Sequence, residues 1–111
     1  MNIRCEDYDH VTVISITGEF NADATEGFRK QIGERLERKV RFFVIDLQQA
    51  TFLDSKGLES LVWVQEQCDE RLGTVRLCNP DETCKKILQV TRIDSRFDMF
   101  ADVAEAVKTM R

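Results

Sequence analysis

The feature of the sequence that most constrains its fold is the apolar run RFFVIDL at residues 41–47. Its hydrophobic residues are continuous rather than alternating, and charge bounds the run. A strand that is apolar on both faces is typical of a parallel sheet, in which helices cover both sides. We therefore expect an interior strand here, with Phe43 and Ile45 buried.

One helix is predicted before this strand in the sequence and one after it, because apolar residues recur in both segments at the helical period of about 3.6 residues. The recurring residues are Phe28, Ile32 and Leu36 in residues 23–38, and Leu58, Leu61, Val62, Cys68 and Leu72 in residues 55–72. Gly73 follows the second helix, at a position where a left-handed helix end is common. Residues 48–54, between the strand and the second helix, are expected to form a loop.

The rest of the chain continues the alternation of strands and helices. The expected strands are residues 2–8, 11–17 and 74–78, with a short strand or turn at 97–100, and the expected helices are residues 80–91 and 102–110. Strands that alternate with helices indicate right-handed parallel crossovers, and the hairpin of the first two strands adds an antiparallel member. The sequence therefore predicts an α/β fold with a mixed sheet of four to five strands and four helices, in a single domain over residues 1–111.

Charge and hydropathy exclude several classes of protein. The chain has 16 Lys and Arg against 20 Asp and Glu, a net charge of −4, whereas proteins that bind nucleic acid need clustered basic residues. No apolar run approaches the ~20 residues of a membrane-spanning helix. The acidic N-terminus, MNIRCEDYDH, does not resemble a signal peptide. We expect a cytoplasmic protein with no nucleic-acid partner and no direct membrane insertion.

The residue patterns of common enzyme and metal sites are missing from the sequence. His10 is its only histidine, its five glycines form no phosphate-binding loop, and it has no nucleophile elbow. A response regulator would need an Asp at the exit of a central strand, a place that Asp46 could take, and an acidic pair after the first parallel strand, where the sequence offers Glu19 without adjacent carboxylates. The cysteines form no C-x-x-C pair, so we expect reduced thiols without disulfides at Cys5, Cys68, Cys78 and Cys84. We predict no catalytic residue, no metal and no cofactor, in a protein that is not an enzyme.

One candidate functional segment remains, the loop-to-helix junction TFLDSKGL at residues 51–58. Asp54 or Ser55 can cap the helix that follows. The first turn of a helix has free backbone N–H groups and the positive end of the dipole, so phosphate added to an exposed hydroxyl there would be stabilised. Gly57 is costly in a helix unless a backbone or a partner must approach closely. The junction is therefore either a simple capped helix or a modification site.

These segments together resemble the STAS family, named for sulfate transporters and anti-sigma factor antagonists, and specifically its free-standing bacterial anti-sigma factor antagonists. VTVISITGEFNADATEGFRKQI, residues 11–32, is similar to the family's opening strand, turn and first helix. RFFVIDLQQATFLDSKGLESLVWV, residues 41–64, is similar to its central strand, D-S-x-G-L junction and second helix. RFDMFADVAEAV, residues 96–107, resembles its last strand and C-terminal helix.

The resemblance implies a partner switch without catalysis by this chain. An antagonist of this kind binds a kinase-fold anti-sigma factor and displaces a sigma factor. The kinase phosphorylates the antagonist, and a phosphatase resets it. By position the phosphoacceptor is Ser55, and Asp54, Gly57 and Leu58 complete the switch motif. Nucleotide and Mg²⁺ would belong to the kinase.

Other interpretations stay open beside the switch. The same domain serves as a constitutive scaffold subunit, in a stressosome-like assembly or a lipid-transport ATPase, and a weaker alternative is a ligand-sensing module. Asn21 stands where the family usually has Asp, Lys56 replaces a usually small residue, and Glu59 stands where Gly is frequent. These three residues favour the scaffold, whereas the intact Ser55 favours the switch.

Trp63 adds an independent indication of binding. At about 100° per residue it should lie opposite the apolar stripe of its helix, where it would be a partner anchor or a cover for its own neighbours. The candidate partner-binding residues are therefore Asn21, Lys56, Glu59 and Trp63.

Overall fold

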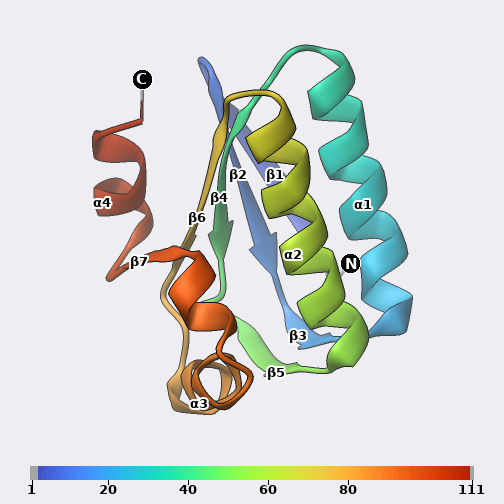
Figure 1. Cartoon of the computed structure of the whole chain (residues 1–111), viewed down its shortest axis with the longest axis vertical. Coiled ribbons are helices and arrows are strands. Elements are labelled where there is room, and N and C mark those ends of the chain that lie inside the picture. Colours follow the sequence, from blue (N-terminus) through green and yellow to red (C-terminus); the bar gives the residue numbers. More distant parts are fainter. Residues whose placement is uncertain (1–2, 111) are drawn as a thin grey trace.

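The structure is a computed structural model and describes residues 3–110. Within that range the chain forms a five-stranded sheet in the order β1-β2-β4-β6-β7, a two-stranded sheet of β3 and β5, and four α-helices (Figure 1). The strands are β1 (Ile3–Tyr8), β2 (Val11–Ile16), β3 (Gly18–Phe20), β4 (Phe42–Asp46), β5 (Ala50–Leu53), β6 (Thr74–Cys78) and β7 (Asp98–Phe100). The helices are α1 (Ala22–Glu37), α2 (Ser55–Glu70), α3 (Glu82–Val90) and α4 (Val103–Lys108), with a short 3-10 helix η1 (Ile93–Arg96).

The predicted α/β fold with a mixed sheet and four helices is confirmed. β1 is antiparallel to β2, and β2, β4, β6 and β7 are parallel neighbours. The predicted start of the first strand at residue 2, and the ends of the predicted domain at residues 1 and 111, lie outside the described residues. None of the described helices has the length and hydropathy needed to cross a bilayer.

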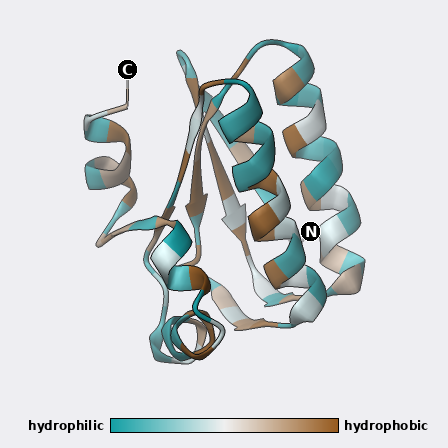
Figure 2. Cartoon of the chain, in the orientation of Figure 1, coloured by the Kyte–Doolittle hydropathy of each residue, from teal (hydrophilic) through white to brown (hydrophobic). Residues whose placement is uncertain are grey.

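The apolar run at residues 41–47 provides the central strand, β4, of a three-layer arrangement. α1 and α2 cover one face of the sheet and α4 covers the other (Figure 1). Phe43 and Ile45 are fully buried on the α1 and α2 face, as predicted, and Val44 is buried on the α4 face. Figure 2 shows hydrophobic residues along β4 and hydrophilic ones on the outward turns of α1 and α2. Continuous apolarity therefore marks a strand packed on both faces.

Each of the four described α-helices begins after an Asn or Asp side chain that accepts a hydrogen bond from a backbone N–H of the first turn. These N-cap residues are Asn21, Asp54, Asp81 and Asp102. Such caps satisfy amide groups that have no partner within the helix. The local sequence thus fixes where each helix starts.

The loop predicted at residues 48–54 contains a strand, and this prediction was wrong. β5 pairs in parallel with β3, which places Phe20 opposite Leu53. Both strands are short, and β5 exposes its two central residues, Thr51 and Phe52, so neither strand carries a clear alternation. The pairing joins segments that are distant in the sequence and brings the starts of α1 and α2 together.

The end of α2 also differs from the prediction. The helix ends at Glu70, and Leu72, expected on its buried face, has a φ of 57° and is 83% exposed. The left-handed residue is therefore Leu72 rather than Gly73. Gly73 is required for another reason, since a Cβ there would lie 2.0 Å from the carbonyl oxygen of Arg41. The helix therefore ends two residues before the predicted end at residue 72, and Gly73 is needed for the close approach of Arg41.

Candidate functional site

The β3–β5 pairing places two helix N-termini side by side. Asn21 follows β3 and Asp54 follows β5, and the backbone N–H of Asp54 donates to the carbonyl oxygen of Phe20 at 3.2 Å. The Asn21 Oδ1 accepts from the Ala24 N–H at 3.2 Å. The Asp54 Oδ1 accepts from the Gly57 N–H at 2.9 Å. Of the two caps that the sequence allowed for α2, the structure has Asp54.

Ser55 is the first residue of α2 and is exposed. Its hydroxyl makes no hydrogen bond to another residue in the described range. The neighbouring amides of the first turn and the positive end of the helix dipole favour an anion at this position. The position can therefore carry an added negative group at low energetic cost to the fold.

Gly57 lets the two strands and α2 approach closely. A Cβ at this position would lie 2.3 Å from the Phe20 carbonyl oxygen and 2.9 Å from a carbon of its ring. The close approach expected from the sequence is real, and the approaching group is this chain's own backbone. Leu58, 9% exposed, belongs to the main core cluster. Asp54, Gly57 and Leu58 thus fix the first turn of α2. Of these four residues Ser55 is exposed, Asp54 is half-buried, and Gly57 and Leu58 are buried.

Lys56 and Glu59 lie beside Ser55 on the solvent side of the first turn. The Lys56 Nζ and the Glu59 Oε2 are 3.4 Å apart, and both side chains are mostly exposed. An exposed pair of this kind contributes only about 0.3–0.5 kcal/mol to helix stability. These residues therefore shape the surface around Ser55 more than they stabilise the fold.

A groove extends from Ser55 along α2 to Glu66, with a volume of about 530 Å³. Its apolar side chains on α2 are Leu58, Val62 and Trp63, and its flanks come from Arg29 of α1 and Ile93 of η1. Val62, expected in the core, is only half-buried and lines this groove.

The sequence suggested that Trp63 points outward, but the structure shows that it does so only in part. It is half-buried and packs against the core cluster. The Arg29 guanidinium lies 5.0 Å from the centre of its ring. The Arg29 Nε also donates to the Oγ of the fully buried Ser60 at 3.0 Å. Trp63 and Arg29 therefore link α1 to α2 while they form one wall of the groove.

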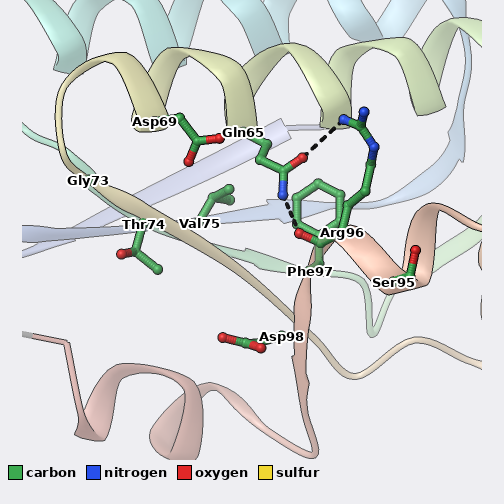
Figure 3. Close-up of a pocket in the computed structure, with 9 residues that line it drawn as sticks. All are labelled: Gln65, Asp69, Gly73, Thr74, Val75, Ser95, Arg96, Phe97 and Asp98. Atoms are coloured by element: carbon green, nitrogen blue, oxygen red, sulfur yellow. Dashed lines mark hydrogen bonds between the residues drawn. The ribbon is translucent and has the colours of Figure 1, made fainter.

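A second pocket, of about 200 Å³, lies between α2, β6 and η1 (Figure 3). The Gln65 side chain bonds to Arg96 twice, through the Arg96 carbonyl oxygen and through its guanidinium. The carboxylates of Asp69 and Asp98 line the same pocket. It is smaller than the ~300 Å³ at which small-molecule sites begin, and within residues 3–110 no cluster of three His, Cys, Asp or Glu side chains could hold a metal. We interpret the Gln65–Arg96 hydrogen bonds as structural contacts that hold η1 against α2.

All four cysteines are free, and three of them, Cys68, Cys78 and Cys84, are buried. Burial raises the pKa of each of these three thiols to about 12. A reactive cysteine needs a lowered pKa, because the thiolate is the nucleophile. None of the three is therefore an activated nucleophile.

Comparison with known proteins identifies relatives over most of the chain. The family model of the STAS domain matches residues 2–106. A STAS-domain containing protein of Pseudomonas aeruginosa (strain UCBPP-PA14) is 31% identical over 84 residues, which cover 76% of this chain and 82% of the relative.

Solved structures share the fold. An anti-sigma factor antagonist from Mycobacterium paratuberculosis is 25% identical, with a TM-score of 0.85 over 98% of this chain and 92% of the other. The Bacillus cell fate determinant SpoIIAA in its phosphorylated form is 22% identical, with a TM-score of 0.79 over 98% of this chain and 99% of the other.

Proposed function

The chain belongs to the STAS domain family, and we propose that within this family it is an anti-sigma factor antagonist controlled by phosphorylation. It binds a kinase-type anti-sigma factor in the cytoplasm and so regulates transcription. The kinase phosphorylates Ser55, and a phosphatase removes the phosphate. The kinase supplies nucleotide and Mg²⁺, and this chain performs no catalysis.

The observation that carries the proposal is the position of Ser55. Its hydroxyl is exposed at the start of α2, and the other three motif residues hold that start in place. A phosphate there faces free amides and the helix dipole, so the fold stays intact on modification. A protein with this fold exists in a phosphorylated form, which supports the same chemistry here.

The effect of phosphorylation belongs to the partner surface. We propose that the partner contacts Asn21, Lys56 and Glu59 around Ser55 and reaches Trp63 along the groove. An added phosphate brings about −1.5 to −2 charges to a surface that binds as a neutral hydroxyl. Burying an unpaired charge costs several kcal/mol, enough to weaken binding a hundredfold or more.

The test is incubation with the kinase-type anti-sigma factor of the same host and ATP, followed by peptide mapping. We expect phosphate on Ser55, none on the Ser55→Ala variant, and full modification of Ser95→Ala. Ser95 is a suitable control because it is exposed and lies on η1. The Ser55→Ala variant should stay bound to the kinase in the presence of ATP.

A constitutive scaffold subunit is the second candidate, and the Lys56–Glu59 ion pair beside Ser55 favours it. Two long charged side chains there obstruct close docking of a kinase active site. Binding without any modification would support the scaffold and refute the switch. Phosphate on a different residue would refute Ser55 as the acceptor.

A further inference from the structure

β1 leaves a long strand edge without a partner. It is the terminal strand of the five-stranded sheet and has six residues, whereas β7 at the other edge has three. In the described part of the chain β1 pairs with β2 alone. An edge strand presents a row of unpaired N–H and C=O groups that can template pairing with another chain.

The charges on β1 alternate in sign along one face. Arg4 and Glu6 project from the same side of the sheet, because side chains alternate along a strand. Their side chains are 78% and 49% exposed, and the Arg4 Nη2 lies 3.6 Å from the Glu6 Oε1. Asp7 projects from the opposite side, where Arg35 and Thr12 bind its carboxylate.

We propose that β1 pairs antiparallel with β1 of a second copy of this chain, about a two-fold axis at Cys5, and joins the two sheets into one. In this register Arg4 lies opposite Glu6 of the second copy, and Glu6 lies opposite its Arg4. Opposite charges at such cross-strand positions are stabilising. The pattern of charges on β1 is therefore complementary to itself.

Neighbouring registers are disfavoured by the same charges. An axis at Arg4 would place two arginines opposite each other, and an axis at Glu6 would place two glutamates opposite each other. Like charges directly opposite are destabilising. In the Cys5 register Ile3 faces Asp7 of the second copy, whose carboxylate is already bound by Arg35. Among these three registers of self-pairing, charge therefore favours the one about Cys5.

The Cys5 register also provides a reporter of proximity. Directly opposed residues in antiparallel strands have Cα atoms about 4.5–5.5 Å apart, within the roughly 4.4–6.8 Å that a disulfide requires. Cys5 is half-buried, whereas the other three cysteines are buried. Diamide can therefore link the two Cys5 thiols, which lose two protons and two electrons while the N=N bond of diamide takes them up and becomes a hydrazine.

The first test is sedimentation velocity of the whole protein over a concentration series. We expect a reversible monomer–dimer equilibrium. Arg4→Glu or Glu6→Arg alone should weaken dimerisation at least about tenfold, since each replaces two attractive contacts by two repulsive ones. The double variant Arg4→Glu/Glu6→Arg should restore dimerisation. Lys85→Glu, which reverses the charge of an exposed residue on α3, is the control and should leave dimerisation unchanged.

The second test is oxidation by diamide followed by electrophoresis without reductant. The wild-type protein should give a covalent dimer, and Cys5→Ser should give none while it still dimerises reversibly. A wild-type protein that stays monomeric at all concentrations would overturn the proposal. A dimer that is indifferent to both charge reversals and is not linked through Cys5 would overturn it as well. Neither result depends on Ser55, because Ser55→Ala should dimerise like the wild type.

Discussion

Two glycines on helices of similar length have opposite surroundings. Gly57 lies in the first turn of α2 against the Phe20 backbone, whereas nothing lies within 4 Å of a Cβ built at Gly33 of α1. Glycine inside a helix costs roughly 0.5–1 kcal/mol relative to alanine, unless the space for a side chain is already taken. The same substitution should therefore change stability in opposite directions at the two positions.

Gly57→Ala should lower the free energy of unfolding by about 1–3 kcal/mol, because the new methyl group forces the Phe20 backbone away. Gly33→Ala should raise it by about 0.5–1 kcal/mol, because it meets no contact and stiffens the unfolded chain. Urea unfolding followed by circular dichroism measures both. Equal effects of the two variants would show that Phe20 does not restrict Gly57.

At the scale of an element, the end of α2 holds a residue in an unfavourable conformation. Leu72 adopts a φ of 57° and exposes most of its side chain. The left-handed region costs an L-residue about 1–2 kcal/mol, and glycine escapes this cost.

Leu72→Gly should therefore raise the free energy of unfolding, by up to about 1 kcal/mol. Gly73→Ala should lower it, because its Cβ would collide with Arg41. Thermal unfolding of the two single variants distinguishes these roles. A Leu72→Gly variant less stable than the wild type would mean that the Leu72 side chain packs in a way that its 83% exposure does not show.

The contact between α1 and α2 leads to a prediction about Trp63. Because Trp63 is half-buried and lies under Arg29, Trp63→Ala should cost about 1–2 kcal/mol of stability, more than an ordinary surface change. It should also weaken partner binding by roughly 2 kcal/mol or more, the range of interface hot spots. Trp63→Phe keeps a ring and should lose less of both. Unchanged binding in Trp63→Ala would leave the residue with a packing role alone.

Local patterns in the sequence account for most elements and for the position of Ser55. The helical spacing of Phe28, Ile32 and Leu36 predicted α1, and the continuous apolar run RFFVIDL predicted β4, because each pattern lies within a short stretch of the chain. β3 and β5 escaped prediction because each is short and its partner lies far along the chain. The contact of Trp63 with Arg29 depends on how α1 packs against α2, which no local period reports.

At the scale of the whole molecule, an ion pair fastens the edge strand to the first helix. Both Arg35 Nε and Nη2 donate to the Asp7 carboxylate, at 3.2 and 3.1 Å, and the Thr12 hydroxyl donates to it at 2.7 Å. The hydrogen bonds from Arg35 and Thr12 lower the pKa of Asp7 below its ordinary value of 3.8. The folded state therefore stabilises the ionised carboxylate of Asp7.

The sign of the pH dependence follows from this lowered pKa. The contribution of Asp7 to stability is present above pH 3.8, and it is lost as the pH falls through the lower pKa of the folded state. Asp7→Asn should remove this part of the acid sensitivity and lower stability near neutral pH. The effect should be modest, because the carboxylate is about half exposed and solvent screens it.

Chemical unfolding of the wild type and Asp7→Asn at several pH values measures this difference. Asp9→Asn is the matched control, since Asp9 is exposed in the neighbouring turn and forms no ion pair in the described range. Parallel pH profiles for the wild type and Asp7→Asn would contradict the assignment.

The pairing of β3 with β5 makes the surface around Ser55 a product of tertiary structure. Asn21 and Asp54 become neighbours only after strands distant in the sequence have met. A newly synthesised or unfolded chain has the same sequence around Ser55 but does not present this surface. An enzyme that recognises the surface rather than the linear peptide would therefore modify folded molecules and leave unfolded ones unmodified.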